Sequence, residues 1–204
     1  MGGGTFELYT TSNGLPPRGR AMTSRKSTSL GLESGTVRVV PYDPTWPDLY
    51  ADEVARLEQV LAAHGLSLVF EHTGSTAVNG LAAKPVLDIL AGHRSEEERR
   101  VAIAALQAGG YLFRGEQGIS GRDFFRRGQP RQYHIHLTMI GSRFWQDQRT
   151  FRDYLRAHPD AAAAYGKLKN DLMARYPRDR EAYIEGKTAF VEAILAAGRA
   201  LAKS

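Results

Sequence analysis

The chain of 204 residues contains no cysteine. This absence excludes disulfide bonds, thiolate metal ligands and a cysteine nucleophile, and it suits the cytoplasm, where we expect the protein to reside. No stretch approaches the ~18 uninterrupted apolar residues that a membrane helix requires; the longest candidate, 190–201, carries Glu192 and Arg199. The first residues lack the basic and apolar stretches of a secretory signal. We therefore expect no membrane partner.

Dense runs of one charge are also missing. The chain has 27 lysine and arginine residues against 22 acidic ones, which gives a net charge of +5 at pH 7. This mild balance favours an anionic ligand, and a nucleotide or a phosphorylated small molecule satisfies it as well as DNA or RNA. Because basic and aromatic residues are not densely interleaved, we expect no nucleic-acid partner, and modification of RNA ends is the weakest of our hypotheses.

The chain has two parts of different composition. Residues 1–36 are rich in Gly, Ser, Thr and Arg, follow neither the helical nor the strand period, and contain too little apolar surface to offset the entropy of ordering. We interpret them as a disordered tail, or as an added extension that precedes a natural start at Met22. Residues 37–204 are predicted to form one domain.

Hydrophobic patterns predict the elements of this domain. Strands are expected at 37–40, 67–71, 84–91, 111–113, 123–126 and 132–139, and the last three are expected to be antiparallel because their links are short. Helices are expected at 50–61, 95–108, 143–157, 160–175 and 180–201. Helices clustered after the strands indicate an α+β fold.

The most informative stretch is HTGST at 72–76, followed by KPVLDI at 84–89. The pattern predicts a strand, a Gly-Ser turn, a short helix and a second strand. Gly74 lets the backbone approach a ligand closely, and Ser75 suits a cap that turns backbone amides to a phosphate; the alternative is an ordinary capped loop. Asp88 lies in an apolar run, where an unpaired charge is costly. Its partner is either a metal ion or an arginine.

A second chemical signal is the pair His134 and His136. Residues two apart on a strand share a face, so both imidazoles could bind a metal or supply a base near neutral pH; the alternative is ordinary polarity at a strand edge. If this strand lies beside that of Asp88, a carboxylate, imidazoles and a cation converge. Glu116 could complete a metal shell or act as a base, or it is a solvated loop charge.

Basic residues are the third signal. Arg126 belongs to a group of arginines between 122 and 131, and arginine clamps suit triphosphate or carboxylate groups. Arg152 belongs to a stripe of arginines on the predicted helix 143–157, for which a solvated face is the alternative. Lys187 interrupts the apolar stripe of the last predicted helix, so its ammonium either reaches solvent or meets an anion in a cleft.

These motifs resemble the GrpB family, which is similar to the nucleotidyltransferase superfamily. The resemblance includes VVPYDPTWP at 39–47, the whole of 71–89, the histidine pair and FRDYLRAHP at 151–159, and it extends from about residue 37 to about residue 197. It implies a short mixed sheet with flanking helices and a C-terminal helical segment. It also implies a transferase that uses ATP or another nucleoside triphosphate with a divalent metal (Mg²⁺, Mn²⁺ or Zn²⁺).

The resemblance implies that Asp88 binds the metal, with His136 in place of another carboxylate, and that the Gly-Ser turn holds phosphates. We add that Glu116 or His134 deprotonates a small-molecule acceptor. The residues expected to hold the nucleotide are Gly74, Ser75, Thr76, Lys84, Arg126, Arg152, Lys169 and Lys187.

The sequence departs from the pattern of the superfamily. Leu90 stands where a second metal-binding carboxylate is usual, and Asn79 stands where many relatives carry proline. One aspartate and one histidine offer a single, softer site that suits Mn²⁺ or Zn²⁺, or one Mg²⁺ held largely by the substrate's phosphates. Two hypotheses follow: an enzyme that nucleotidylates, activates or ligates a small acceptor, and a catalytically inactive module that binds a nucleotide or phosphorylated metabolite.

Overall fold

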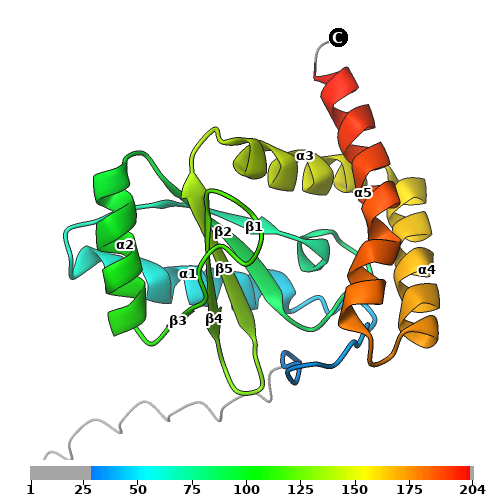
Figure 1. The fold of residues 1–204 in the computed structure, drawn as a ribbon, viewed down its shortest axis with the longest axis horizontal. Helices are drawn as coiled ribbons and strands as arrows, with labels where there is room; N and C mark the ends of the chain where they lie inside the picture. Colours follow the sequence, from blue (N-terminus) through cyan, green and yellow to red (C-terminus); the bar gives the residue numbers. More distant parts are fainter. Residues whose placement is uncertain (1–28, 203–204) are drawn as a thin grey trace, which may run out of the picture.

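A computed structural model describes residues 29–202 (Figure 1). The predicted tail falls mostly on residues 1–28, outside the described residues. Residues 29–36, which we included in that tail, pack on the domain: Leu30 and Leu32 are buried, and Leu32 forms a β-bridge with Arg131. The packed chain therefore begins before residue 37, because two leucines supply apolar surface that the composition of the segment conceals.

Within residues 29–202, five strands form one sheet and five α-helices pack around it, which confirms the α+β class. The strands are β1 (Val69–Thr73), β2 (Leu87–His93), β3 (Leu112–Phe113), β4 (Arg122–Arg127) and β5 (Tyr133–Met139). The helices are α1 (Trp46–Ala62), the short 3-10 turn η1 (Ser75–Ala77), α2 (Glu96–Ala108), α3 (Arg143–Ala157), α4 (Pro159–Arg175) and α5 (Arg180–Leu201). No helix in this range has the length and apolarity needed to cross a bilayer.

The strands lie in the order β1-β2-β5-β4-β3. β2 and β5 are parallel, while β1 with β2, β4 with β5 and β3 with β4 are antiparallel, so the predicted antiparallel pairing of the last three strands is confirmed. The strand predicted at 37–40 is wrong: only Val40 pairs, through an isolated bridge to Ala83. The prolines that follow in the sequence end the pairing there.

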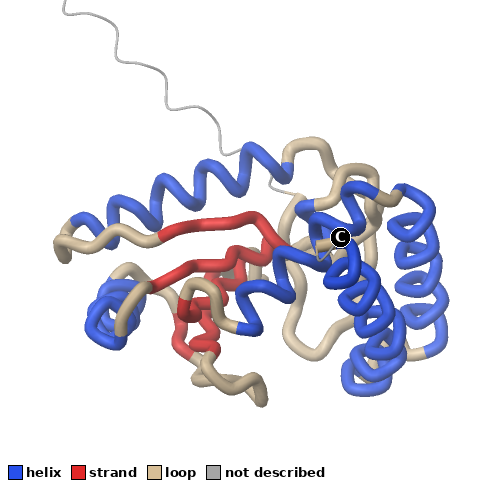
Figure 2. Tube along the Cα trace, turned by 90° about the horizontal axis from the view of Figure 1, so that it is seen from above, coloured by secondary structure: helices blue, strands red, loops and turns tan. Residues whose placement is uncertain are grey.

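The two faces of the sheet differ in character. The face toward α1 and α2 carries the larger core, in which Ile89, Phe125 and Ile135 are fully buried against both helices. Figure 2 shows the sheet between helical layers. Because side chains alternate along a strand, the residues next to these, including Asp88 and His134, point to the opposite face. The polar side chains of β2 and β5 therefore lie on the face of the sheet against which α3 packs.

Candidate functional site

The pairing of β2 with β5 places the predicted aspartate and histidines next to each other. Asp88 is directly opposite His134, and His134 is directly opposite Arg126 of β4, so the three form one row across the sheet. His136 follows in the next row, opposite Leu90. The expected adjacency of the aspartate strand and the histidine strand is confirmed.

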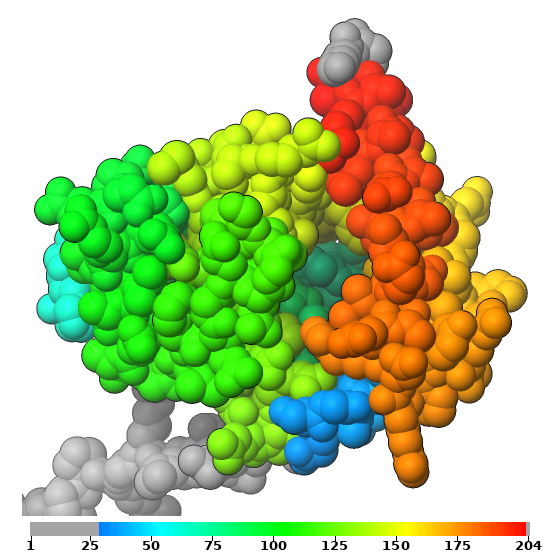
Figure 3. All heavy atoms as spheres, viewed as in Figure 1, coloured from blue at the N-terminus to red at the C-terminus, as the bar shows by residue number. Residues whose placement is uncertain are grey.

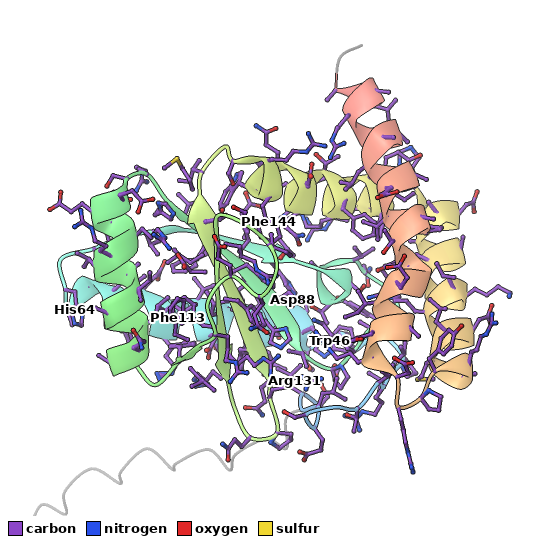
Figure 4. The ribbon with its side chains drawn as sticks, in the orientation of Figure 1. Trp46, His64, Asp88, Phe113, Arg131 and Phe144 are labelled. Atoms are coloured by element: carbon purple, nitrogen blue, oxygen red, sulfur yellow. The ribbon has the colours of Figure 1, made fainter. Side chains whose placement is uncertain are left out.

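Asp88 is the centre of a cluster of polar side chains (Figure 4). Its Oδ1 lies 3.0 Å from Nδ1 of His134 and 3.3 Å from Nε2 of His136. The ammonium of Lys84 donates to both carboxylate oxygens, at 3.0 and 2.9 Å. Lys84, four residues before Asp88 in the sequence, is thus the ion-pair partner, rather than the arginine that we considered.

The protonation of the cluster follows from burial and from Lys84. Burial opposes ionisation of Asp88, but Lys84 and the two histidines outweigh it, so the pKa of Asp88 lies well below its usual range. Burial, together with the charge of Lys84, lowers the pKa of His134 to about 3. Burial also lowers the pKa of His136. At pH 7 the cluster therefore combines one carboxylate with two neutral imidazoles.

This donor set fits a divalent metal ion. One ligand atom each of Asp88, His134 and His136 lies within 4.8 Å of the others. Nδ1 of His134 lies 3.3 Å from the Lys84 ammonium as well as 3.0 Å from Asp88, and one ring nitrogen cannot accept from the first and donate to the second at once. A metal ion bound by Nδ1 of His134 and by the carboxylate of Asp88 would remove this conflict, because the nitrogen would then not need to donate a proton to Asp88. The mixture of one oxygen and two nitrogen ligands favours Mn²⁺ or Zn²⁺ over Mg²⁺.

Gly74 lies directly against the cluster. It has φ of +70°, and a Cβ built on it would lie 2.7 Å from Oδ2 of Asp88. Glycine is therefore needed at this position for two reasons. Other residues rarely adopt this positive φ, and any side chain here would collide with the carboxylate of Asp88. The next residue, Ser75, begins η1 and contacts the phenol of Tyr165 on α4, so the turn joins the sheet to the C-terminal helices.

Gly74→Ala is expected to lower stability by about 1–3 kcal/mol and to weaken Mn²⁺ or Zn²⁺ binding at least about tenfold, because Asp88 must move. Calorimetric titration of metal and thermal unfolding measure the two effects. Gly80→Ala is the matched control: Gly80 also has positive φ, +75°, but no atom lies within 4 Å of a Cβ placed on its backbone. Equal metal affinity in both variants would show that the Gly74 contact does not position Asp88.

The cluster opens into a cavity of ≈ 600 Å³ between β4, β5, α4 and α5. Figure 3 shows the surface hollowed between the sheet side of the molecule and α5. Two of the lining side chains are carboxylates, Asp88 and Asp147. The cationic lining side chains are Arg38, Lys84, Arg122, Arg126, Arg131, Lys169, Arg180 and Lys187. The cavity is therefore rich in positive charge and has the volume of a small-molecule site.

Three lysines lie together at the α4 and α5 side of this cavity, and we call Lys84, Lys169 and Lys187 the lysine cluster. Burial, with the charges of Lys187 and Lys84, lowers the pKa of Lys169 to about 7. Burial, with the charge of Lys84, lowers the pKa of Lys187 to about 8. Lys169 donates to the carbonyl of Ala82. Lys187 is half-buried, with its ammonium 4.6 Å from the centre of the Tyr183 ring and in the lining of the cavity.

The structure does not place every predicted residue in the cavity. Thr76 lies outside the described lining, and its hydroxyl contacts Nε2 of His72 at 3.0 Å. Glu116 also lies outside, because its carboxylate accepts from the amide of Gly121 at 2.7 Å and closes its own loop. Neither side chain is positioned to contact a ligand at Asp88.

Arg152 is a further predicted nucleotide ligand that the structure places elsewhere. It is 6% exposed, bridges Glu71 of β1 at 2.5 Å and Asp153 at 2.7 Å, and donates to the carbonyl of His72. It therefore attaches α3 to the sheet, and neither a solvated helix face nor a phosphate clamp describes it. Glu71 is paired with Leu90 in the sheet. Because its carboxylate binds Arg152, Glu71 does not replace the second metal-binding carboxylate that the sequence lacks at Leu90.

Arg152→Gln is expected to lower the free energy of unfolding by about 1–3 kcal/mol, because Glu71 loses its buried partner and keeps only the half-exposed Arg149, at 3.1 Å. Nucleotide and metal affinity of the folded variant should stay within about twofold of the parent. Urea unfolding and calorimetric titration test these expectations. If the variant instead loses much of its nucleotide affinity while its stability is unchanged, Arg152 contacts the nucleotide as the sequence predicted.

Sequence reasoning missed part of the cavity lining. Arg180, at the start of α5, and Arg38, near the N-terminal end of the described chain, both line the cavity. Exposed arginines at a helix start and in an irregular segment carry no periodic or motif signal. Phe124, which packs against both histidines at centroid distances of 4.9 and 5.3 Å, was predicted only as a strand residue. These contributions depend on tertiary placement.

Comparisons with known proteins identify the family and agree with the fold. The family model described as "GrpB protein" matches residues 36–197. The UPF0157 protein of Pseudomonas aeruginosa is 42% identical over 173 residues, 81% of this chain and 68% of that protein. A crystal structure of conserved protein GrpB from Enterococcus faecalis has a TM-score of 0.74 and 31% identity over 82% of this chain and 100% of that chain. A dephospho-CoA kinase of Mycolicibacterium paratuberculosis is 28% identical over 177 residues, 74% of this chain and 43% of that enzyme.

Proposed function

Because this chain belongs to the GrpB family, we propose that it is a nucleotidyltransferase-like enzyme. It would use a nucleoside triphosphate and a divalent metal to nucleotidylate or activate a small-molecule acceptor. The observation that carries the proposal is the convergence of Asp88, His134 and His136 on the floor of a cavity lined by cations. A carboxylate and imidazoles for a metal, beside positive charge for phosphates, are the parts that nucleotidyl transfer requires.

The lysine cluster and the Gly-Ser turn would hold the triphosphate. Gly74 and Ser75 line the same cavity as Lys84, Lys169 and Lys187, and lysine ammonium groups bind phosphates as point charges. Positive charge at this place stabilises the negative charge that builds on the leaving pyrophosphate. Asp88 and His136, with His134 as a third ligand, would hold the metal, which when bound polarises a phosphoryl oxygen.

The dephospho-CoA kinase similarity supports a nucleotide-related ligand. The name of that protein denotes a kinase, and kinases act on nucleoside triphosphates. Since the matched region is 43% of that enzyme, the similarity supports nucleotide-related chemistry in general and not transfer of a phosphoryl group to a given acceptor. The proposal therefore depends mainly on the cavity of this chain.

Titration with a non-hydrolysable ATP analogue, with and without Mn²⁺, tests the proposal together with an assay for pyrophosphate release. We expect binding of one nucleotide per chain that is strengthened by the metal, and release of pyrophosphate from ATP when a suitable acceptor is present. Binding without release under all acceptor mixtures would favour the inactive module, which Leu90 in place of a second carboxylate motivates. If no nucleoside triphosphate binds, the enzyme hypothesis is wrong, and the inactive module is left only with another nucleotide or a phosphorylated metabolite as its ligand.

A further inference from the structure

We propose that the cavity contains a second anion site, formed by Arg126, Arg131 and Arg180, which binds the carboxylate group of the acceptor. We call these three residues the arginine cluster. The acceptor would then be a carboxylic acid, and the product a mixed anhydride of that acid with a nucleotide. The reaction rests on the proposed function. The anion site does not, because it is inferred from the contacts of the three arginines themselves.

Within the described chain the arginine cluster forms no ion pair with a carboxylate, and the charges of Asp88 and Glu33 act on Arg131 less than those of Arg126 and Arg180 do. No acidic residue of 29–202 lies within ion-pair distance of Arg126, Arg131 or Arg180. Nε of Arg126 is buried without a hydrogen-bond partner, and its guanidinium packs over the ring of Phe124 at 5.4 Å. Burial, followed by the charges of Arg126 and Arg180, lowers the pKa of Arg131, so the three charges lie near one another. Arg126 and Arg131 are half-buried, whereas Arg180 is exposed at the rim. Two half-buried guanidinium groups beside a third positive charge are costly without a counter-charge unless an anion binds them.

The arginine cluster lies on the other side of the metal ligands from the Gly-Ser turn. Across the sheet the order is Thr73, Asp88, His134 and Arg126, and Gly74 continues from Thr73. Two strand spacings separate the backbones of Asp88 and Arg126, which is about 10 Å. In Figure 4 Arg131 is labelled on one side of Asp88, toward the start of α5. The metal ligands thus lie between the Gly-Ser turn and Arg126, while the charge of Arg180 acts on Lys187. A triphosphate at the lysine cluster and an acceptor at the arginine cluster would therefore lie next to each other.

The charge of the cavity exceeds what a nucleotide can neutralise. Eight cationic side chains line it, against the two carboxylates of Asp88 and Asp147. Both carboxylates are already paired, Asp88 with Lys84 and Asp147 with Arg143 and Arg199. A nucleoside triphosphate carries about four negative charges, of which a divalent ion offsets about two. The nucleotide alone therefore leaves most of the positive charge uncompensated, and a second anion is needed.

The groups around the metal ligands favour a carboxylate over a hydroxyl or an amine as acceptor. Both carboxylates of the lining are ion-paired, Glu116 is turned to its own loop, and the two imidazoles are turned to Asp88. No free carboxylate base thus lines the described cavity. A carboxylate needs none, because it is already ionised at neutral pH.

The step is balanced without proton transfer. A carboxylate oxygen forms a bond to the α-phosphorus, the bond from that phosphorus to the bridging oxygen of the β-phosphate breaks, and pyrophosphate leaves with the electron pair. The planar guanidinium fork of arginine matches a carboxylate in a bidentate way. The arginine cluster would hold and orient the attacking group.

The anion site is tested by titrating the protein with malonate, succinate and glutarate in the presence of Mn²⁺ and a non-hydrolysable ATP analogue. The controls are the uncharged diamide of each acid and inorganic phosphate. We expect at least one dicarboxylate to bind and its diamide not to bind. Arg131→Gln should weaken that dicarboxylate about 10- to 100-fold and change the affinity for the ATP analogue less than about threefold. Lys169→Gln is the matched control and should weaken binding of the ATP analogue while changing the affinity for the dicarboxylate little. Arg126→Lys serves as a second variant, and circular dichroism checks that each variant folds.

Each other outcome is decisive. If Arg131→Gln weakens the ATP analogue as strongly as the dicarboxylate, the arginines belong to the triphosphate site and the inference is wrong. It is also wrong if the diamides or inorganic phosphate bind as well as the dicarboxylates, or if no dicarboxylate binds. Dicarboxylate binding without any nucleotide binding would refute the proposed function and retain the anion site. Carboxylate-dependent exchange of pyrophosphate into ATP, lost in Arg131→Gln, would establish both.

Discussion

Asp88→Asn is expected to lower turnover by about 1,000-fold or more in a protein that still folds. The substitution keeps the size of the side chain but removes the negative charge that holds Lys84 and faces His134 and His136. It also removes the one carboxylate among the candidate metal ligands. We therefore expect metal affinity and turnover to fall together, the first by at least about 100-fold, since two neutral imidazoles alone hold a divalent ion weakly.

The fold should survive this change because the ion-pair partner of Asp88 is not trapped. The side chain of Lys84 is 39% exposed, so its ammonium can turn to solvent when the carboxylate is lost. Titration with Mn²⁺ and Zn²⁺, thermal unfolding and pyrophosphate release measure the three quantities on one sample. Retained metal affinity would remove Asp88 from the ligands, and retained turnover would remove it from the mechanism.

Asp123→Asn is the matched control for this prediction. Asp123 is also a buried carboxylate of the same sheet, but it points to the opposite face and binds Arg99 at 2.5 and 2.9 Å. Its substitution should lower stability by about 1–3 kcal/mol, because Arg99 loses a buried partner but is itself one-third exposed (34%) and keeps Glu96, and it should leave metal affinity unchanged. Opposite outcomes for two buried aspartates would separate the role of Asp88 from a general effect of charge loss.

The elements of the fold were predictable where one period of the sequence dominates. The predicted bounds of the last three helices differ from α3, α4 and α5 by at most one residue, because a 3.6-residue stripe ended by proline has no competing explanation. The adjacency of Asp88 and His134 was also predictable, since an apolar strand with one carboxylate and a strand with two imidazoles on one face suit the same site. Local pattern and chemistry agreed there.

The remaining features depend on tertiary placement, which no local pattern encodes. Leu30 and Leu32 pack on the domain from within a polar segment, and Arg180 reaches the cavity from a helix start. Arg152 looked like a ligand because a stripe of arginines has the same period whether it faces solvent, a phosphate or Glu71. Its partner, 81 positions earlier in the sequence, could be identified only from the packing of α3 on β1.

Nucleotide affinity is expected to fall steeply as the pH rises from 7 to 9. Phosphates bind the charged forms of Lys169 and Lys187, whose pKa values in the free protein are lowered to about 7 and about 8. A bound anion raises both values, so binding takes up protons, and affinity is highest below pH 7 and declines as each lysine loses its proton in the free state. The charged fraction of Lys169 falls about 50-fold and that of Lys187 about tenfold between pH 7 and pH 9, which together give a loss of about 500-fold.

This pH dependence is specific to the lysine cluster because other groups change too little or in the opposite direction. The terminal phosphate of a nucleotide ionises near pH 6, so its charge is complete over this range, and metal ligands bind more strongly as protons leave. Titration of an ATP analogue at constant ionic strength measures the profile. Lys169→Arg keeps the charge at every pH and should reduce the slope by about one logarithmic unit per pH unit. A flat profile in the parent protein would mean that the triphosphate does not bind at Lys169 and Lys187.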